Sequence, residues 1–158
     1  MPIPVLIDLL AEELDALPEE ACVYLNRKSG EFVTFPNHDV GIVEDGLEEE
    51  EEFEWDYPPE AIAQLREIVE STHWITLPDK HDIHEWSIMQ RFADSVPEPL
   101  SSNLNRAIHG RGAFRSFRNE LDRSGRTQAW YDFKHEHLVA LLSEILTDEH
   151  VPFRRGRV

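Results

Sequence analysis

Two glycines and three arginines lie close together in the string HGRGAFRSFR, and they could bind an anion. They are Gly110, Arg111, Gly112, Arg115 and Arg118. Glycine permits backbone geometries that other residues avoid, and the free N–H groups at a helix start favour negative charge. At about 100° per residue, a helix beginning near Gly112 would pack Phe114, Phe117 and Leu121, with the arginines on the adjacent strip. This pattern predicts a site for a phosphate, a carboxylate or an acidic partner.

The same arginines have an alternative interpretation, in which they pair with the protein's own acids. The chain has 32 Asp and Glu residues against 15 Lys and Arg residues. The string is not a Walker A motif, because no Gly-Lys-Ser/Thr follows it, and no predicted strand leads into it as in a dinucleotide-binding fingerprint. We therefore expect no cofactor, and both interpretations of the arginines stay open.

A second group of polar side chains lies in DKHDIHEW, where His81, His84 and Glu85 follow at helical spacing. Their order differs from the zinc-binding patterns His-Glu-x-x-His and His-x-x-Glu-His, so no metal site is predicted. Glu85 falls inside the apolar arc of its helix, where an unpaired buried carboxylate would be costly. We expect it either to pair with an arginine of the 111–118 strip or to lie exposed in the first helical turn, where the helix dipole favours an acid.

These groups allow two classes of function. In the first, the protein is a non-catalytic binding or regulatory module. In the second, a small enzyme uses Glu85 with His81 or His84 as acid–base groups on a phosphorylated or carboxylated substrate, provided that they and the arginines converge on one pocket. Asp132 and His135 form another acid–base candidate, but no nucleophile lies nearby in the sequence. We favour the first class and leave enzymatic activity open.

Charge is distributed unevenly along the chain. Residues 1–100 carry 25 acids and 5 bases, whereas residues 101–158 carry 7 acids and 10 bases. The formal net charge of −17 disfavours contact with nucleic acid or an anionic membrane surface. Nine of the thirteen residues at 44–56 are acidic, so we expect segment 44–57 to lie on the surface. The expected partner is a protein or a small anionic ligand, and a homodimer is left open.

The elements that must position these residues predict an α+β fold. A hairpin is expected over 21–36, with a further strand near 73–77 and a weaker one near 40–43. Helices are expected over 6–17, 59–71, 79–95, 100–108, 113–123 and from 127 or 132 to 146. They predict a single domain, 1–158, in which helices pack around a small antiparallel sheet, with a loose basic tail at 152–158.

Cysteine content and hydropathy indicate the compartment. The single Cys22 cannot form an internal disulfide, and the acidic start of the chain lacks the features of a signal peptide. No apolar run approaches the ~18 residues of a membrane span. We therefore expect a cytoplasmic protein.

Four strings resemble those of a bacterial protein family. They are VYLNRKSGEFV from Val23, WITLPDKHDIHEWSIMQRFADSV from Trp74, IHGRGAFRSFRNEL from Ile108 and WYDFKHEHL from Trp130. Their order and spacing are similar to those of the uncharacterised protein family numbered 0158, over residues 23–146. The resemblance implies no particular activity, cofactor or site residue. The acidic segment lies outside the matched strings.

Overall fold

The central strand of the main sheet is β2 (Ala21–Asn26) in the computed structural model, which describes residues 3–49 and 54–157. Strands β3 (Phe32–Pro36) and β4 (Trp74–Thr76) flank it, both antiparallel, in the order β3-β2-β4. In the tight turn after β2, the Asn26 side-chain oxygen accepts hydrogen bonds from two backbone N–H groups. Gly30 closes this turn at φ +75°, where a Cβ would lie 2.7 Å from the Ile3 carbonyl oxygen. The predicted hairpin and the strand near 73–77 are confirmed.

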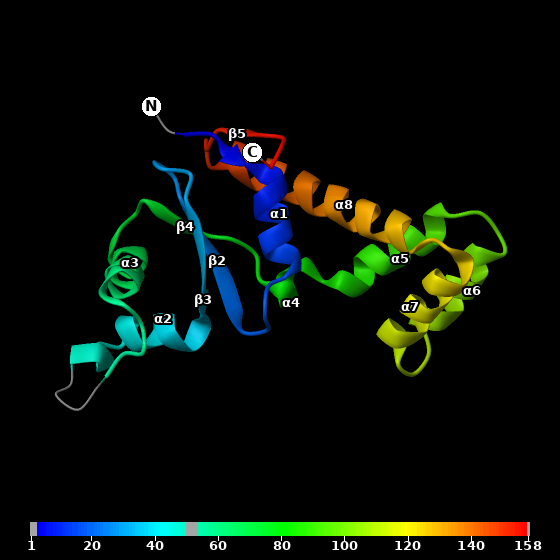
Figure 1. Cartoon of the computed structure of the whole chain (residues 1–158), viewed down its shortest axis with the longest axis horizontal. Coiled ribbons are helices and arrows are strands. Elements are labelled where there is room, and N and C mark those ends of the chain that lie inside the picture. The colour runs from blue at the N-terminus through cyan, green and yellow to red at the C-terminus, as the bar shows by residue number, and fades with distance from the viewer. Residues whose placement is uncertain (1–2, 50–53, 158) are drawn as a thin grey trace.

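Helices cover both faces of the sheet and extend beyond it (Figure 1). They are α1 (Ile7–Asp15), α2 (Asn37–Glu44), the 3-10 helix η1 (Leu47–Glu49), α3 (Pro59–Glu70), α4 (Lys80–Ile83), α5 (Glu85–Ser95), α6 (Leu100–Ile108), α7 (Ala113–Ser124) and α8 (Thr127–Asp148). The chain thus forms a single α+β domain, as its sequence predicts. No helix in the described part of the chain is long and apolar enough to cross a bilayer.

Side chains of β2 alternate between two cores, because successive residues of a strand point to opposite faces. Val23 and Leu25 join the core made with α1 and the second half of α8. Tyr24 joins the core on the opposite face, which contains Val40 of α2 and Leu65 of α3. We call the sheet with these helices the sheet end of the molecule.

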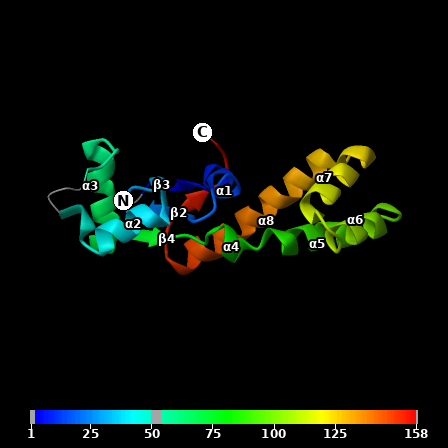
Figure 2. The ribbon, with the colours of Figure 1, turned by 90° about the horizontal axis from the view of Figure 1, so that it is seen from below.

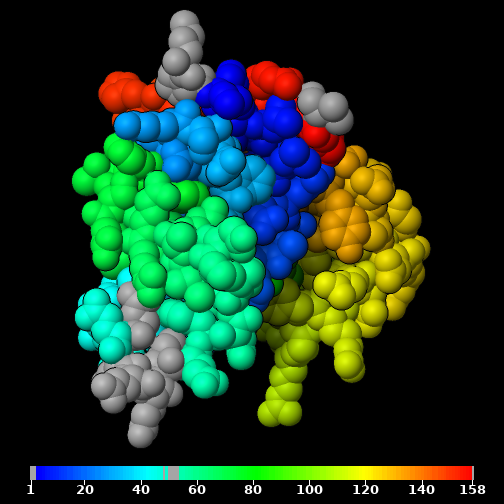
Figure 3. Space-filling view, turned by 60° about the vertical axis from the view of Figure 1, so that its left-hand side comes forward, coloured from blue at the N-terminus to red at the C-terminus, as the bar shows by residue number. Residues whose placement is uncertain are grey.

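A third core forms the helical end, where α5, α6 and α7 pack against the start of α8. Phe92, Phe117 and Trp130 meet there edge to face, with centroids 5.0 Å apart for Phe117 and Trp130. Figures 1 and 2 show the two ends separated along an elongated molecule, with α8 passing from one to the other. Figure 3 shows the dark blue surface of α1, on the sheet end, next to the orange and yellow surface of the helical end. Helix α8 therefore joins the ends, because Trp130 belongs to one core and Leu142 to another.

Two predicted elements are wrong in type or extent. The weak strand expected at 40–43 is part of helix α2, because Val40 and Val43, three residues apart on a helix, pack against Leu65. The helix expected over 79–95 is broken at His84, which is left-handed at φ 56° and separates α4 from α5. Just before this break, Ile83 packs against the cores of both ends.

The predicted loose tail is also wrong for the described residues 152–157. Strand β5 (Phe153–Arg154) pairs in parallel with β1 (Val5–Leu6). Beyond it, Arg155 binds Asp8 and Glu136, and Arg157 binds Glu12. The tail is ordered because its basic side chains neutralise acids on α1 and α8.

The acidic segment 44–57 is only partly described, and residues 50–53 lie outside the described residues. Glu54 and Asp56 are exposed, as expected for a surface segment. The aromatic residues between and after them pack against the sheet end. Tyr57 also donates a hydrogen bond to Asp39, which raises the pKa of Tyr57 to about 12.

Asp8 is the one charged residue that is buried in the described part of the chain. Its carboxylate accepts hydrogen bonds from the Arg155 guanidinium (2.9 and 3.1 Å) and the Gly156 N–H (2.6 Å). The Nε2 atom of His135 lies 2.7 Å from the same carboxylate. These contacts, that with Arg155 above all, hold the pKa of Asp8 well below its usual value, although burial acts in the opposite direction.

We predict that Asp8→Asn lowers the free energy of unfolding by about 2–3 kcal/mol, because charge-assisted hydrogen bonds to a buried acceptor are lost. Urea unfolding followed by circular dichroism measures this change. The exposed Asp132→Asn is the matched control, and we expect it to cost less than about 0.5 kcal/mol. Equal effects of the two variants would contradict the role given to Asp8.

The contribution of Asp8 to the free energy of unfolding should decrease in acid. Because its pKa is lower in the folded than in the unfolded chain, its stabilisation is fully present above the unfolded value of about 3.9. That stabilisation is lost as the pH falls from there toward the folded pKa. The difference in unfolding free energy between wild type and Asp8→Asn should therefore be smaller at about pH 3 than at about pH 5. A difference that grows on acidification would contradict this assignment.

Candidate functional site

The predicted arginine strip lies on the outer side of α7. This helix begins after Gly112, whose φ of 61° makes it a left-handed N-cap. Arg111, Arg115 and Arg118 are exposed, and none of the three forms a hydrogen bond or ion pair with another described residue. By contrast, Arg123 on the same helix pairs with Glu120 at 3.3 Å. Pairing with the protein's own acids therefore accounts for Arg123 but not for the strip.

Within α7 the arginines share one sector of the helix surface. Arg115 and Arg118 are three residues apart and hence neighbours on that surface. The adjacent sector packs into the core of the helical end through Phe117 and Leu121. Phe114 was expected on this packed face, but it is 55% exposed. It lies at the start of α7, where it lines an open groove.

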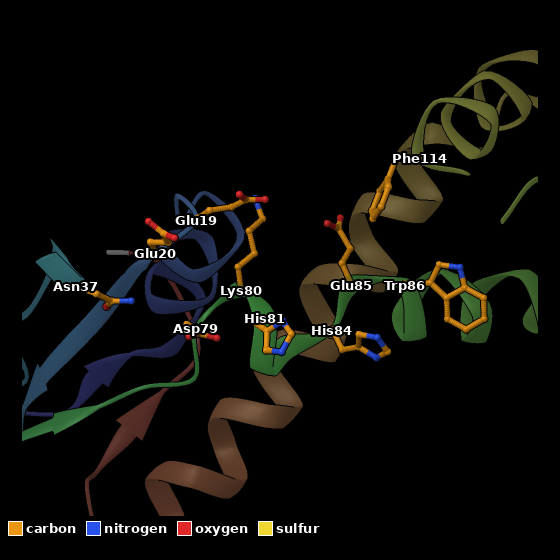
Figure 4. A pocket seen from close by; sticks show the side chains of 10 residues that line it. All are labelled: Glu19, Glu20, Asn37, Asp79, Lys80, His81, His84, Glu85, Trp86 and Phe114. Carbon is orange, nitrogen blue, oxygen red and sulfur yellow. The ribbon is translucent and has the colours of Figure 1, made fainter. Parts of the chain in front are cut away.

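This groove, which we call the inter-end groove, has a volume of about 500 Å³. It is lined by Glu19, Glu20, Asn37, Asp79, Lys80, His81, His84, Glu85, Trp86 and Phe114. Figure 4 shows the sheet end contributing Glu19, Glu20 and Asn37, and the helical end contributing Trp86 and Phe114. His81, His84 and Glu85 lie between these two sets.

Glu85 does not meet an arginine, as one interpretation of the sequence proposed. Its Oε1 atom accepts a hydrogen bond from Lys134 Nζ at 2.5 Å, and Lys134 also donates to Asp15 at 2.6 Å. The Lys134 side chain is only 13% exposed. Burial alone would lower the pKa of Lys134, but the hydrogen bonds to the two carboxylates outweigh burial and raise it. Helices α1, α5 and α8 are thus connected through one partly buried ammonium group.

The histidines of the groove are not assembled as a metal site. His81 is exposed, and His84 Nδ1 lies 2.6 Å from the Ser87 hydroxyl. Among the described residues no group of three or more His, Cys, Asp or Glu side chains could hold a metal ion. Glu85, His81 and His84 do line one groove, which the enzymatic alternative requires. The arginines of α7 are not part of that lining, however, so the groove lacks the substrate-holding cations of that alternative.

The other acid–base candidate is not formed. His135 contacts Asp8 rather than Asp132, and Asp132 accepts a hydrogen bond from Gln128 at 3.0 Å. Sequence reasoning also missed Lys134 as the partner of Glu85, because 49 residues separate them. The sequence offered one local pattern, in which Lys134 follows Trp130 by one helical turn. In the structure the Lys134 Nζ atom lies 5.9 Å from the centroid of the Trp130 ring.

Comparison with protein-family models, curated proteins and solved structures finds no match to this chain. The resemblance to the family numbered 0158 stays a prediction from the four sequence strings. The candidate site is therefore interpreted from its own geometry and charge.

We predict that Glu85→Gln lowers the free energy of unfolding by about 1 kcal/mol, because a charge-assisted hydrogen bond in a partly buried position is weakened. Glu19→Gln provides the matched control, since Glu19 lines the same groove but is exposed and should change stability by less than about 0.5 kcal/mol. Thermal and urea unfolding measure both variants. A neutral Glu85→Gln would show that Lys134 is held by Asp15 alone.

Proposed function

We propose that this protein is a non-catalytic binding module whose α7 arginines recognise an acidic segment of another protein. The observation that carries the proposal is the exposure of Arg111, Arg115 and Arg118 without partners among the described residues. In a chain with 32 acidic side chains, cations left unpaired on the surface are available to an acid from outside.

An acidic protein segment fits this surface better than a free inorganic anion. Arg115 and Arg118 are exposed on α7, Arg111 is exposed just before its N-cap, and none of the three lines the inter-end groove. Phe114, at the start of the same helix, adds exposed apolar surface beside the cations, and aromatic and arginine side chains are enriched in protein interfaces. A free phosphate would interact with the arginines but would gain no apolar contact with the Phe114 ring.

The charge of the whole molecule argues against nucleic acid as the partner. A net charge of −17 repels a polyanion at long range, whereas a short acidic segment meets only the local cationic surface. The cytoplasm is part of the same proposal, since a lone cysteine suits a reducing compartment. The resemblance to family 0158 implies no activity and is compatible with a binding role.

The test is titration of a fluorescein-labelled peptide of alternating glutamate and phenylalanine, followed by anisotropy. We expect saturable binding that weakens as salt is raised, because exposed charge pairs are screened. Arg115→Ala combined with Arg118→Ala should weaken binding about tenfold, since two charge-assisted contacts are lost.

Arg123→Ala is the matched control, because this arginine lies on the same helix but is paired with Glu120. It should change affinity by less than about twofold. An equal loss in the control would mean that general charge attraction accounts for binding. Competition by inorganic phosphate at concentrations equal to those of the peptide would favour a free anion and overturn the proposal of a protein partner.

A further inference from the structure

The inter-end groove carries charge opposite to that of the α7 arginines. Glu19 and Glu20, in the loop between α1 and β2, are both exposed and project at its sheet side (Figure 4). Asp79 lies nearby and caps α4 by accepting a hydrogen bond from the Asp82 N–H. Glu85, further along, is already neutralised by Lys134. The net negative charge is therefore concentrated at the sheet side, where Glu19, Glu20 and Asp79 outnumber Lys80, the one lysine or arginine among the described lining residues.

The helical side of the groove is aromatic. Phe114 is 55% exposed and lies opposite the acidic side (Figure 4). Trp86 is held in place, because its indole N–H donates to the Ile108 carbonyl at 3.0 Å and its ring meets His109 edge to face. A fixed ring beside an exposed ring provides apolar contact area at little cost in side-chain entropy.

The two sides together define the occupant. We propose that the groove binds an extended segment of a partner protein that carries lysine or arginine residues followed by an aromatic or aliphatic side chain. The basic residues lie against Glu19 and Glu20, and the apolar residue packs against Phe114 and Trp86. Charge complementarity between the acidic side and the segment carries this assignment.

A chain segment fits the groove better than an enclosed small molecule. Small-molecule pockets bury most of their ligand, whereas most residues lining this groove are themselves exposed to solvent. The position of the basic residues along the groove is also restricted. Beyond Phe114, α7 continues into Arg115 and Arg118, which repel further basic residues and so restrict the cationic part to the sheet side.

This inference does not depend on the proposed function: the two surfaces share Phe114, but their charged residues differ and carry opposite charges, so they attract different partners. Its probe is a fluorescein-labelled peptide with three lysines at one end and a phenylalanine at the other. We expect saturable binding to the full chain in an anisotropy titration. Glu19→Lys combined with Glu20→Lys should weaken binding at least about tenfold, and Phe114→Ala about fivefold.

Matched controls separate the groove from the overall charge. Glu31→Lys combined with Glu144→Lys changes the net charge equally at exposed positions outside the groove, and Tyr131→Ala removes another exposed aromatic ring. Each control should change affinity less than about twofold. Thermal unfolding of every variant checks that it is folded, and Phe114→Ala provides a second test if the charge reversal is unstable.

Three outcomes would overturn the inference. They are a lack of saturable binding to the wild type, an equal loss in the Glu31/Glu144 control, and displacement of the peptide by spermine at equal concentration, which would indicate a small cation instead of a chain segment. Arg115→Ala with Arg118→Ala should leave binding of this peptide intact or strengthen it. If the lysine–phenylalanine peptide does not bind but the acidic peptide does, the inference about the groove is wrong and the proposed function is unaffected.

Discussion

One polar turn of α8 holds the molecule together where its hydrophobic cores stop. Lys134 binds acids of α1 and α5, His135 contacts the buried Asp8, and Glu136 binds Arg155 of the C-terminal tail. Three consecutive side chains therefore tie three separate segments to one helix. Because a buried carboxylate or ammonium group is costly without a partner, these contacts specify the arrangement as well as stabilise it. The inter-end groove exists because this turn fixes the sheet end against the helical end.

The contacts of this turn also determine which basic side chains are paired within the protein and which stay unpaired on its surface. Lys134 and Arg155 are used internally, and Arg157 neutralises Glu12. The acids near them are thereby neutralised without any help from α7. The arginine strip consequently keeps its charge on the surface, next to a groove of opposite sign. Two exposed surfaces of opposite charge, the two for which partners are proposed, can coexist on one small domain because the internal pairs are satisfied elsewhere.

Features that depend on local sequence could be predicted, and features that depend on distant contacts could not. The hairpin follows from strand-forming residues around a glycine turn, and α7 follows from its flanking glycines. By contrast, Val40 and Val43 favour a strand in isolation and become helical because they pack against α3. The order of the tail depends on Asp8, 147 residues from Arg155. The groove is likewise lined by residues that range from Glu19 to Phe114 in the sequence, and no sequence spacing predicts that they lie close together.

The continuity of α8 has a mechanical consequence for the groove. A helix of this length acts as a rigid rod, and it carries core residues of both ends without interruption. The two ends that supply the acidic and aromatic walls are therefore joined by one continuous helix. A fixed arrangement of the two walls would reduce the entropy lost when the proposed segment binds.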